Sequence, residues 1–158
     1  MLADITAYGI GNFIHVLAVV LAFGPTFAYP IFIATAQRTA PQSVPAVLRG
    51  LVQVDRFLVT PGMIVVLLAG IYMLAEGDIS AGESWVSVGF VAILVLFAMA
   101  GMFFAPRNRR ALELAERDLA SGDEFSPEFE ALSKQIALGG QIAALIVVVT
   151  IFFMVVKP

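Results

Sequence analysis

The sequence predicts an all-α integral membrane protein, a single domain over residues 1–158 that folds as a bundle of four transmembrane helices. Three observations support this fold class. Hydrophobic residues make up 60% of the 158 residues and charged residues only 13%, whereas soluble domains average about 45–50% and about 25%. The apolar residues fall in four uncharged runs. Lys and Arg are concentrated in the first and third connections between those runs.

The four predicted spans cover about residues 8–36, 57–75, 84–106 and 135–156. They lie in the uncharged runs Ile5–Gln37, Phe57–Ala75, Ser84–Pro106 and Gln135–Val156. A helix rises about 1.5 Å per residue and the hydrocarbon core is about 30 Å thick, so about 20 residues cross it. No Lys or Arg precedes the first run, and a cleaved signal peptide has a basic start. We therefore expect the first run to remain as a span.

The distribution of basic residues predicts the orientation. Of the nine Lys and Arg residues, only Lys157 lies outside the connections Arg38–Arg56 and Arg107–Lys134. Positive charge stays on the cytoplasmic side, so we expect both termini to be extracytoplasmic, in the inner membrane of a bacterium. Three aromatic residues of the kind that favours the membrane interface then lie near the outer one: Tyr8, Tyr72 and Trp85.

The two basic connections have helical patterns of their own. Residues 46–59 are amphipathic and fit either a helix on the membrane surface or the first turns of span two. The third connection predicts a helical hairpin extension between spans three and four, with ion pairs Arg109–Glu113 and Glu113–Arg117. Its helices stop at Gly122 and restart at Ser126. This hairpin is interpreted as a solvated extension or as a docking surface for another subunit.

Several function classes are excluded or disfavoured. A net charge of −3 gives no basic field for nucleic acid, and the absence of Cys excludes disulfides and thiolate sites. Glycine-rich phosphate loops, nucleophile elbows and zinc-protease motifs are missing, so the sequence points away from an enzyme. The expected partners are the lipid bilayer and other membrane subunits or a second copy.

The candidate ligand site lies in the outer half of span one. His15 is the only histidine, and Asn12 lies one helical turn away on the same face. Tyr72 and Met73 of span two are expected at a similar depth, and the four residues form the predicted cofactor site. An imidazole binds haem iron through a ring nitrogen, so His15 is the candidate metal ligand for haem b. A structural hydrogen bond to Asn12, a hydroxyl or a backbone carbonyl is the alternative, and a proton relay is a third.

Further features bear on function at the other end of the spans. Asp55 and Arg56 flank the start of span two and are expected to form an interfacial ion pair. Gly140 and Ala144 are expected to face another helix, because small residues allow close packing. Three prolines lie in spans one and two: Pro25, Pro30 and Pro61. They either bend the helices for packing or expose backbone carbonyls, as in the broken helices of transporters.

Three segments carry a resemblance that covers nearly the whole chain. They read FIHVLAVVLAFGPTFAYPIFIA in span one, TPGMIVVLLAGIYML in span two and TIFFMVVKP at the end. The chain resembles an uncharacterised bacterial family of integral membrane proteins, domain of unknown function 2269. More distantly, a four-helix core with a histidine in the first span is similar to the copper-resistance CopD group and the HemJ-type protoporphyrinogen oxidases. That distant similarity implies haem at His15.

The sequence thus leaves three functions open. The most concrete is a haem-binding or small-ligand-binding bundle that uses His15. The second is a non-catalytic accessory or structural subunit of a membrane complex. The third is a small transporter or channel, although no acidic residue lies within the spans to bind a coupling ion.

Overall fold

The computed structural model describes residues 6–77, 79–80, 82–122 and 124–158. Within these ranges every regular element is helical, and four helical columns are long and apolar enough to cross a membrane. The columns are Ala7–Thr39, Pro41–Glu76, Ser84–Ser121 and Pro127–Val156. The predicted all-α, four-span class is confirmed. Which side of the membrane the termini face stays a prediction.

Each column is built from shorter elements. The first holds α1 (Ala7–Phe23), a 3₁₀ turn (Pro25–Phe27) and α2 (Tyr29–Thr39). The second holds a 3₁₀ turn (Pro41–Ser43), α3 (Val44–Val54), a π-helical turn (Asp55–Val59) and α4 (Thr60–Glu76). The third holds α5 (Ser84–Ala98), a π-helical turn (Met99–Phe104) and α6 (Ala105–Ser121), and the fourth is α7 (Pro127–Val156).

Prolines explain where the columns are irregular. Pro25 opens the 3₁₀ turn between α1 and α2, and both π-helical turns end just before a proline, Pro61 or Pro106. A proline has no N–H for the carbonyl four residues back, and its ring crowds that turn, so the ladder of hydrogen bonds shifts there. At the first break, the Thr26 hydroxyl donates to the carbonyl of Phe23 at 2.6 Å.

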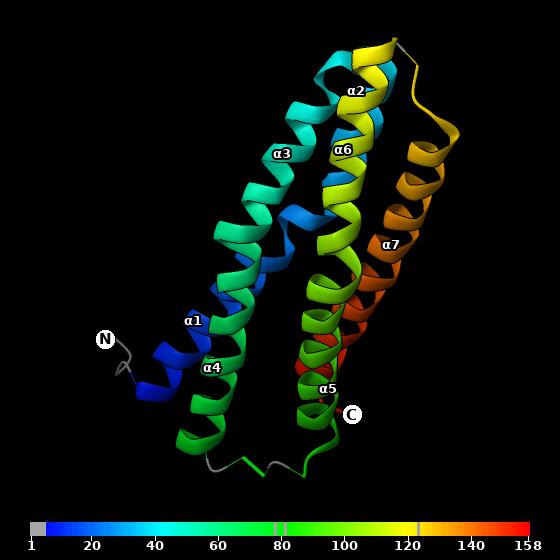
Figure 1. The fold of residues 1–158 in the computed structure, drawn as a ribbon. Helices are drawn as coiled ribbons and strands as arrows, with labels where there is room; N and C mark the ends of the chain where they lie inside the picture. The colour runs from blue at the N-terminus through cyan, green and yellow to red at the C-terminus, as the bar shows by residue number, and fades with distance from the viewer. Residues whose placement is uncertain (1–5, 78, 81, 123) are drawn as a thin grey trace.

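The columns are longer than a bilayer requires. They contain 33, 36, 38 and 30 residues, which is about 45–57 Å at 1.5 Å per residue, against about 30 Å of hydrocarbon. Figure 1 shows α2, α3, α6 and the start of α7 gathered at one end of the bundle, opposite the connection between α4 and α5. Most of the charged residues lie at the former end, which we call the charged end.

Two hydrophobic cores correspond to these two parts. In the membrane-spanning part, α1 packs along α4 and α5 along α7, around a core that includes Ala22, Met63, Ile93 and Val147. The charged end has a separate core with residues from α2, α3, α6 and α7: Ala36, Val44, Leu48, Ala111, Leu114, Ala115 and Phe129. The charged end is therefore a small four-helix bundle, not a hairpin alone.

The expectations for the connections can now be compared with the structure. Residues 46–59 continue directly into α4, so they form the first turns of the second column and not a separate surface helix. The hairpin turn is confirmed, since Gly122 caps the end of α6 and the Ser126 hydroxyl accepts a hydrogen bond from the N–H of Phe129 at the start of α7. The ion pairs at this end differ from the predicted ones, as described below.

The expected packing at Gly140 is wrong within a single chain. A Cβ built on Gly140 would meet nothing within 4 Å, whereas one on its neighbour Gly139 would run into the ring of Phe103. Adjacent residues on a helix point about 100° apart because there are 3.6 residues per turn. The glycine that allows close packing of α7 in this chain is therefore Gly139.

Candidate functional site

The face of α1 that carries His15 packs closely on α4. Ala18 and Ala22 are buried on this face, and a Cβ built on Gly62 of α4 would lie 2.9 Å from the Cβ of Ala22. At one end of the same helix contact, Gly11 of α1 packs against the side chains of Tyr72 and Met73 of α4. Small residues let the two backbones approach each other, so α1 and α4 form the tightest helix pair of the spans.

His15 lies half-buried in this interface and bonds to the backbone of α4. Its Nδ1 lies 2.9 Å from the carbonyl oxygen of Val66. A carbonyl only accepts hydrogen bonds, so we assign the proton to Nδ1, which leaves Nε2 with a lone pair. Gly70 provides the room, because a Cβ there would already be in contact with the imidazole at 3.5 Å. Of the structural partners expected for His15, the structure places a backbone carbonyl there.

The other three predicted site residues are only partly brought together. Tyr72 and Met73 lie against Gly11, one turn of α1 away from His15. Asn12 is exposed on the outer surface of α1, and its amide has no hydrogen-bond partner in the described ranges. The expected bond between Asn12 and His15 is therefore not formed.

A haem held between α1 and α4 does not fit these residues. The close contacts of Gly11 with Tyr72 and of Ala22 with Gly62 fill the interface on both sides of His15. A hollow of about 370 Å³ beside Tyr72 is lined by α1 residues that precede His15 and by Ala69 and Tyr72 of α4, but not by His15 itself. No group of three or more His, Cys, Asp or Glu side chains that could hold a metal ion occurs among the described residues.

A polar contact joins two irregular segments near the charged end. The hydroxyl of Tyr29, the first residue of α2, donates to Oδ1 of Asp55 at 2.9 Å, where the π-helical turn begins. The expected ion pair between Asp55 and Arg56 is not formed. The Arg56 guanidinium instead lies over the Phe57 ring, 5.5 Å from its centroid.

Ion pairs join α6 to α7 at the charged end. Arg110 bonds to Glu128 at 2.8 Å and to Glu113 at 3.4 Å, and Arg117 bonds to Asp118 at 2.8 Å and to Glu128 at 3.4 Å. Glu128 thus connects two arginines of the facing helix. The predicted pairs Arg109–Glu113 and Glu113–Arg117 are not formed. Arg110 and Arg117 pair across the hairpin with Glu128, which comes within reach only after the chain turns back.

Asp118 stabilises the hairpin turn between α6 and α7. It is buried, and its Oδ2 accepts a hydrogen bond from the backbone N–H of Ser126 at 2.8 Å. Hydrogen bonds from Ser126, followed by the Arg117 guanidinium, lower the pKa of Asp118 to about 2, because all of them favour the ionised form. The carboxylate therefore stays charged at neutral pH and ties the end of α6 to the start of α7.

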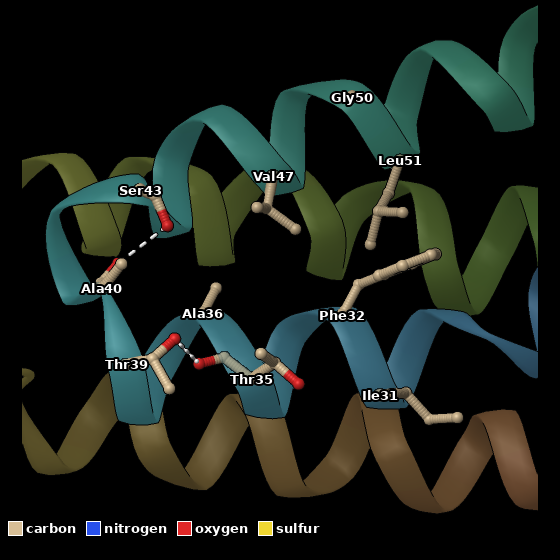
Figure 2. A pocket seen from close by; sticks show the side chains of 10 residues that line it. All are labelled: Ile31, Phe32, Thr35, Ala36, Thr39, Ala40, Ser43, Val47, Gly50 and Leu51. Atoms are coloured by element: carbon tan, nitrogen blue, oxygen red, sulfur yellow. Dashed lines mark hydrogen bonds between the residues drawn. The ribbon is translucent and has the colours of Figure 1, made fainter.

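The sequence analysis did not predict a groove of about 480 Å³ between α2 and α3. Figure 2 shows Phe32, Val47 and Leu51 along it, with hydroxyl groups at one end. Two of these hydroxyls already bond to their own backbone: Thr39 to the carbonyl of Thr35 and Ser43 to the carbonyl of Ala40. The groove therefore offers mainly an apolar surface.

The comparisons with known proteins agree with this architecture. Neither a curated protein nor a solved structure gives a significant match to the chain. A model of a family described as predicted integral membrane protein (DUF2269) matches residues 10–158, which includes all four helical columns apart from the start of α1. The chain therefore belongs to this family of integral membrane proteins.

Proposed function

We propose that the protein is a non-catalytic structural subunit of a membrane assembly and that it associates with a second copy through the outer face of α7. The observation that carries this proposal is the position of Gln141. Its side chain is exposed on the bundle surface and has no partner among the described residues. Around it on α7 are exposed apolar side chains, such as Leu138 and Leu145 at 58% and 64% exposure.

The depth of Gln141 makes an unpaired amide costly. It lies seven residues after Lys134, which precedes the fourth apolar run, so it sits about 10 Å along the helix into that run at 1.5 Å per residue. Lipid tails offer no hydrogen bonds, and an unpaired polar group there is unfavourable. A partner helix that supplies donors and acceptors removes this cost.

A second copy of the chain fits this requirement. A glutamine amide both donates and accepts hydrogen bonds, so two Gln141 side chains related by a twofold axis satisfy each other. Twofold symmetry is the commonest form of association between identical chains. The open space at Gly140 and the small side chain of Ala144 on the same helix let a neighbouring helix approach.

The test is sedimentation equilibrium in a density-matched detergent, with the wild type and three variants. We expect the wild type to dimerise and Gln141→Leu to weaken dimerisation about eightfold or more, the factor for two hydrogen bonds of about 0.6 kcal/mol each. Gln141→Asn retains an amide and should dimerise more strongly than the leucine variant. Asn12→Leu is the matched control, because it removes another exposed amide from a different helix. Asn12 is only four residues from Tyr8, which is expected near the outer interface, so water can satisfy it and the substitution should leave dimerisation unchanged.

Two outcomes would contradict the proposal. One is a wild-type protein that remains monomeric at every ratio of protein to detergent. The other is an equal loss of dimerisation in the Gln141 and Asn12 leucine variants, which would indicate a general effect of hydrophobicity. Helix content measured by circular dichroism confirms that each variant is folded.

A further inference from the structure

The charged end separates its basic residues into two groups. Arg49, Arg110 and Arg117 form ion pairs with acidic side chains. Five other basic side chains have no acidic partner within the described ranges: Arg38, Arg56, Arg107, Arg109 and Lys134. The acidic side chains of the protein therefore do not neutralise the positive charges of this second group.

Members of the unpaired group border the apolar runs. Arg56 directly precedes the run that starts at Phe57, Arg107 follows the run that ends at Pro106, and Lys134 precedes the run that starts at Gln135. The Gly139–Phe103 contact sets the offset of antiparallel α7 and α6. Lys134 and Arg107, five and four residues beyond that contact, are consequently at similar depths. This is the depth at which phospholipid head groups lie.

Arg107 is held in place but is not satisfied by the protein. Its guanidinium carbon lies 4.0 Å from the centroid of the Phe103 ring, and its Nη1 donates to the Phe103 carbonyl at 3.2 Å. Its buried Nε has no acceptor among the described residues. Nη2 has no hydrogen-bond partner among the described residues and is not closed off in this way, so it retains donors for a phosphate oxygen.

We propose that Arg107 binds the phosphate of an anionic phospholipid at the junction of α6 and α7, and that Arg109 and Lys134 strengthen this binding through their charge. The fixed guanidinium supplies directed hydrogen bonds, and the two exposed side chains add positive charge at the same level. These basic side chains have no acidic partner in the protein. An anionic head group such as phosphatidylglycerol supplies a net negative charge to them, whereas a zwitterionic head group does not.

The test measures how many lipid molecules the detergent-purified protein retains, by native mass spectrometry during titration with phosphatidylglycerol or phosphatidylcholine. We expect preferential retention of phosphatidylglycerol. Arg107→Gln and Arg109→Gln should each weaken it about fivefold, the factor for about 1 kcal/mol per basic side chain near anionic lipid. Arg49→Gln is the matched control, since Arg49 is paired with Glu116, and it should retain the lipid like the wild type.

The variants distinguish the proposal from simpler explanations. Arg109 is exposed, so its substitution tests the charge effect even if Arg107→Gln impairs folding. Arg107→Lys keeps the charge without the planar fork and should bind with intermediate strength. Equal retention of both lipids, or an equal loss in Arg49→Gln, would overturn the proposal. So would complete displacement of the lipid by millimolar inorganic phosphate, because the site would then recognise free phosphate.

Discussion

Substitution of Gly139 by alanine tests the packing of α7 against the third column. A Cβ at Gly139 would lie 2.8 Å from Cζ of Phe103, whereas non-bonded carbon atoms prefer about 3.5–4.0 Å. The ring cannot easily turn aside, because Arg107 lies over it at 4.0 Å and Phe104 packs edge-on at 5.1 Å between centroids. Overpacking of this kind costs about 1–3 kcal/mol, and we expect Gly139→Ala to destabilise the fold.

Gly140→Ala is the matched control, since a Cβ there meets nothing within 4 Å in the chain. Both substitutions gain the same helix propensity, up to about 1 kcal/mol, so this gain cancels when the two variants are compared. The difference between their free energies of unfolding then isolates the clash with Phe103, and we expect it to be about 1–3 kcal/mol.

The assay is unfolding of the monomer in mixed micelles of increasing sodium dodecyl sulfate content. Trp85 is the only tryptophan, and its ring lies 4.6 Å from Nζ of Lys157 at the far end of α7, so its fluorescence reports the separation of α5 from α7. Phe103→Leu should relieve part of the cost of Gly139→Ala. The reasoning is refuted if the alanine variants at 139 and 140 unfold with free energies equal to within about 0.5 kcal/mol, the usual scatter of neutral substitutions.

Three further predictions concern His15, Asp118 and the orientation. His15→Ala should lower the free energy of unfolding by about 0.6–2 kcal/mol, the range for membrane hydrogen bonds. His15→Gln should recover part of that loss. The wild-type protein from haem-supplemented cells should show no Soret band, because α1 and α4 pack too closely for haem at His15. A Soret band that is lost in His15→Ala would contradict this reasoning. The pKa of Asp118 is lowered from 3.8 to about 2 in the fold, so its contribution to stability is complete above about pH 4 and is lost as the pH falls towards 2. Asp118→Asn should remove that part of the pH dependence in thermal unfolding. A reporter fused after Asp118 should be cytoplasmic and one fused after Gly82 external, and the reverse pattern would refute the predicted orientation.

Much of the fold could be predicted because it depends on the preference of each segment for lipid and for helix, which is a sum over neighbouring residues. An uncharged apolar run is favourable in lipid wherever its helix lies, so run length alone identifies the four spans. Helix ends at Gly122 and Ser126 depend on residues one to three positions away, and the structure confirms both. The second core at the charged end was missed, because it needs α2 and α3 to reach α6.

The candidate site was less predictable because its contacts join distant segments. His15 could be identified as a buried polar residue, but its acceptor is the carbonyl of Val66, which carries no side-chain signal. Asp55 also has a partner other than the expected one, because it bonds to Tyr29 and not to the adjacent Arg56. Sequence proximity suggested both expected partners, Asn12 and Arg56, whereas the observed partners lie on other helical segments.

The sequence by itself therefore determined the membrane class, the four spans and the turns that end the helices. Only the tertiary structure decided which glycine of α7 packs against the third column and which carbonyl accepts the hydrogen bond from His15. It also decided which arginines at the membrane boundary have no acidic partner. The physical reason is that the preference of a segment for lipid or helix is set within that segment. A contact between helices depends on the rotation and axial offset of both, and a shift of one residue, about 100° around the axis, replaces Gly139 with Gly140.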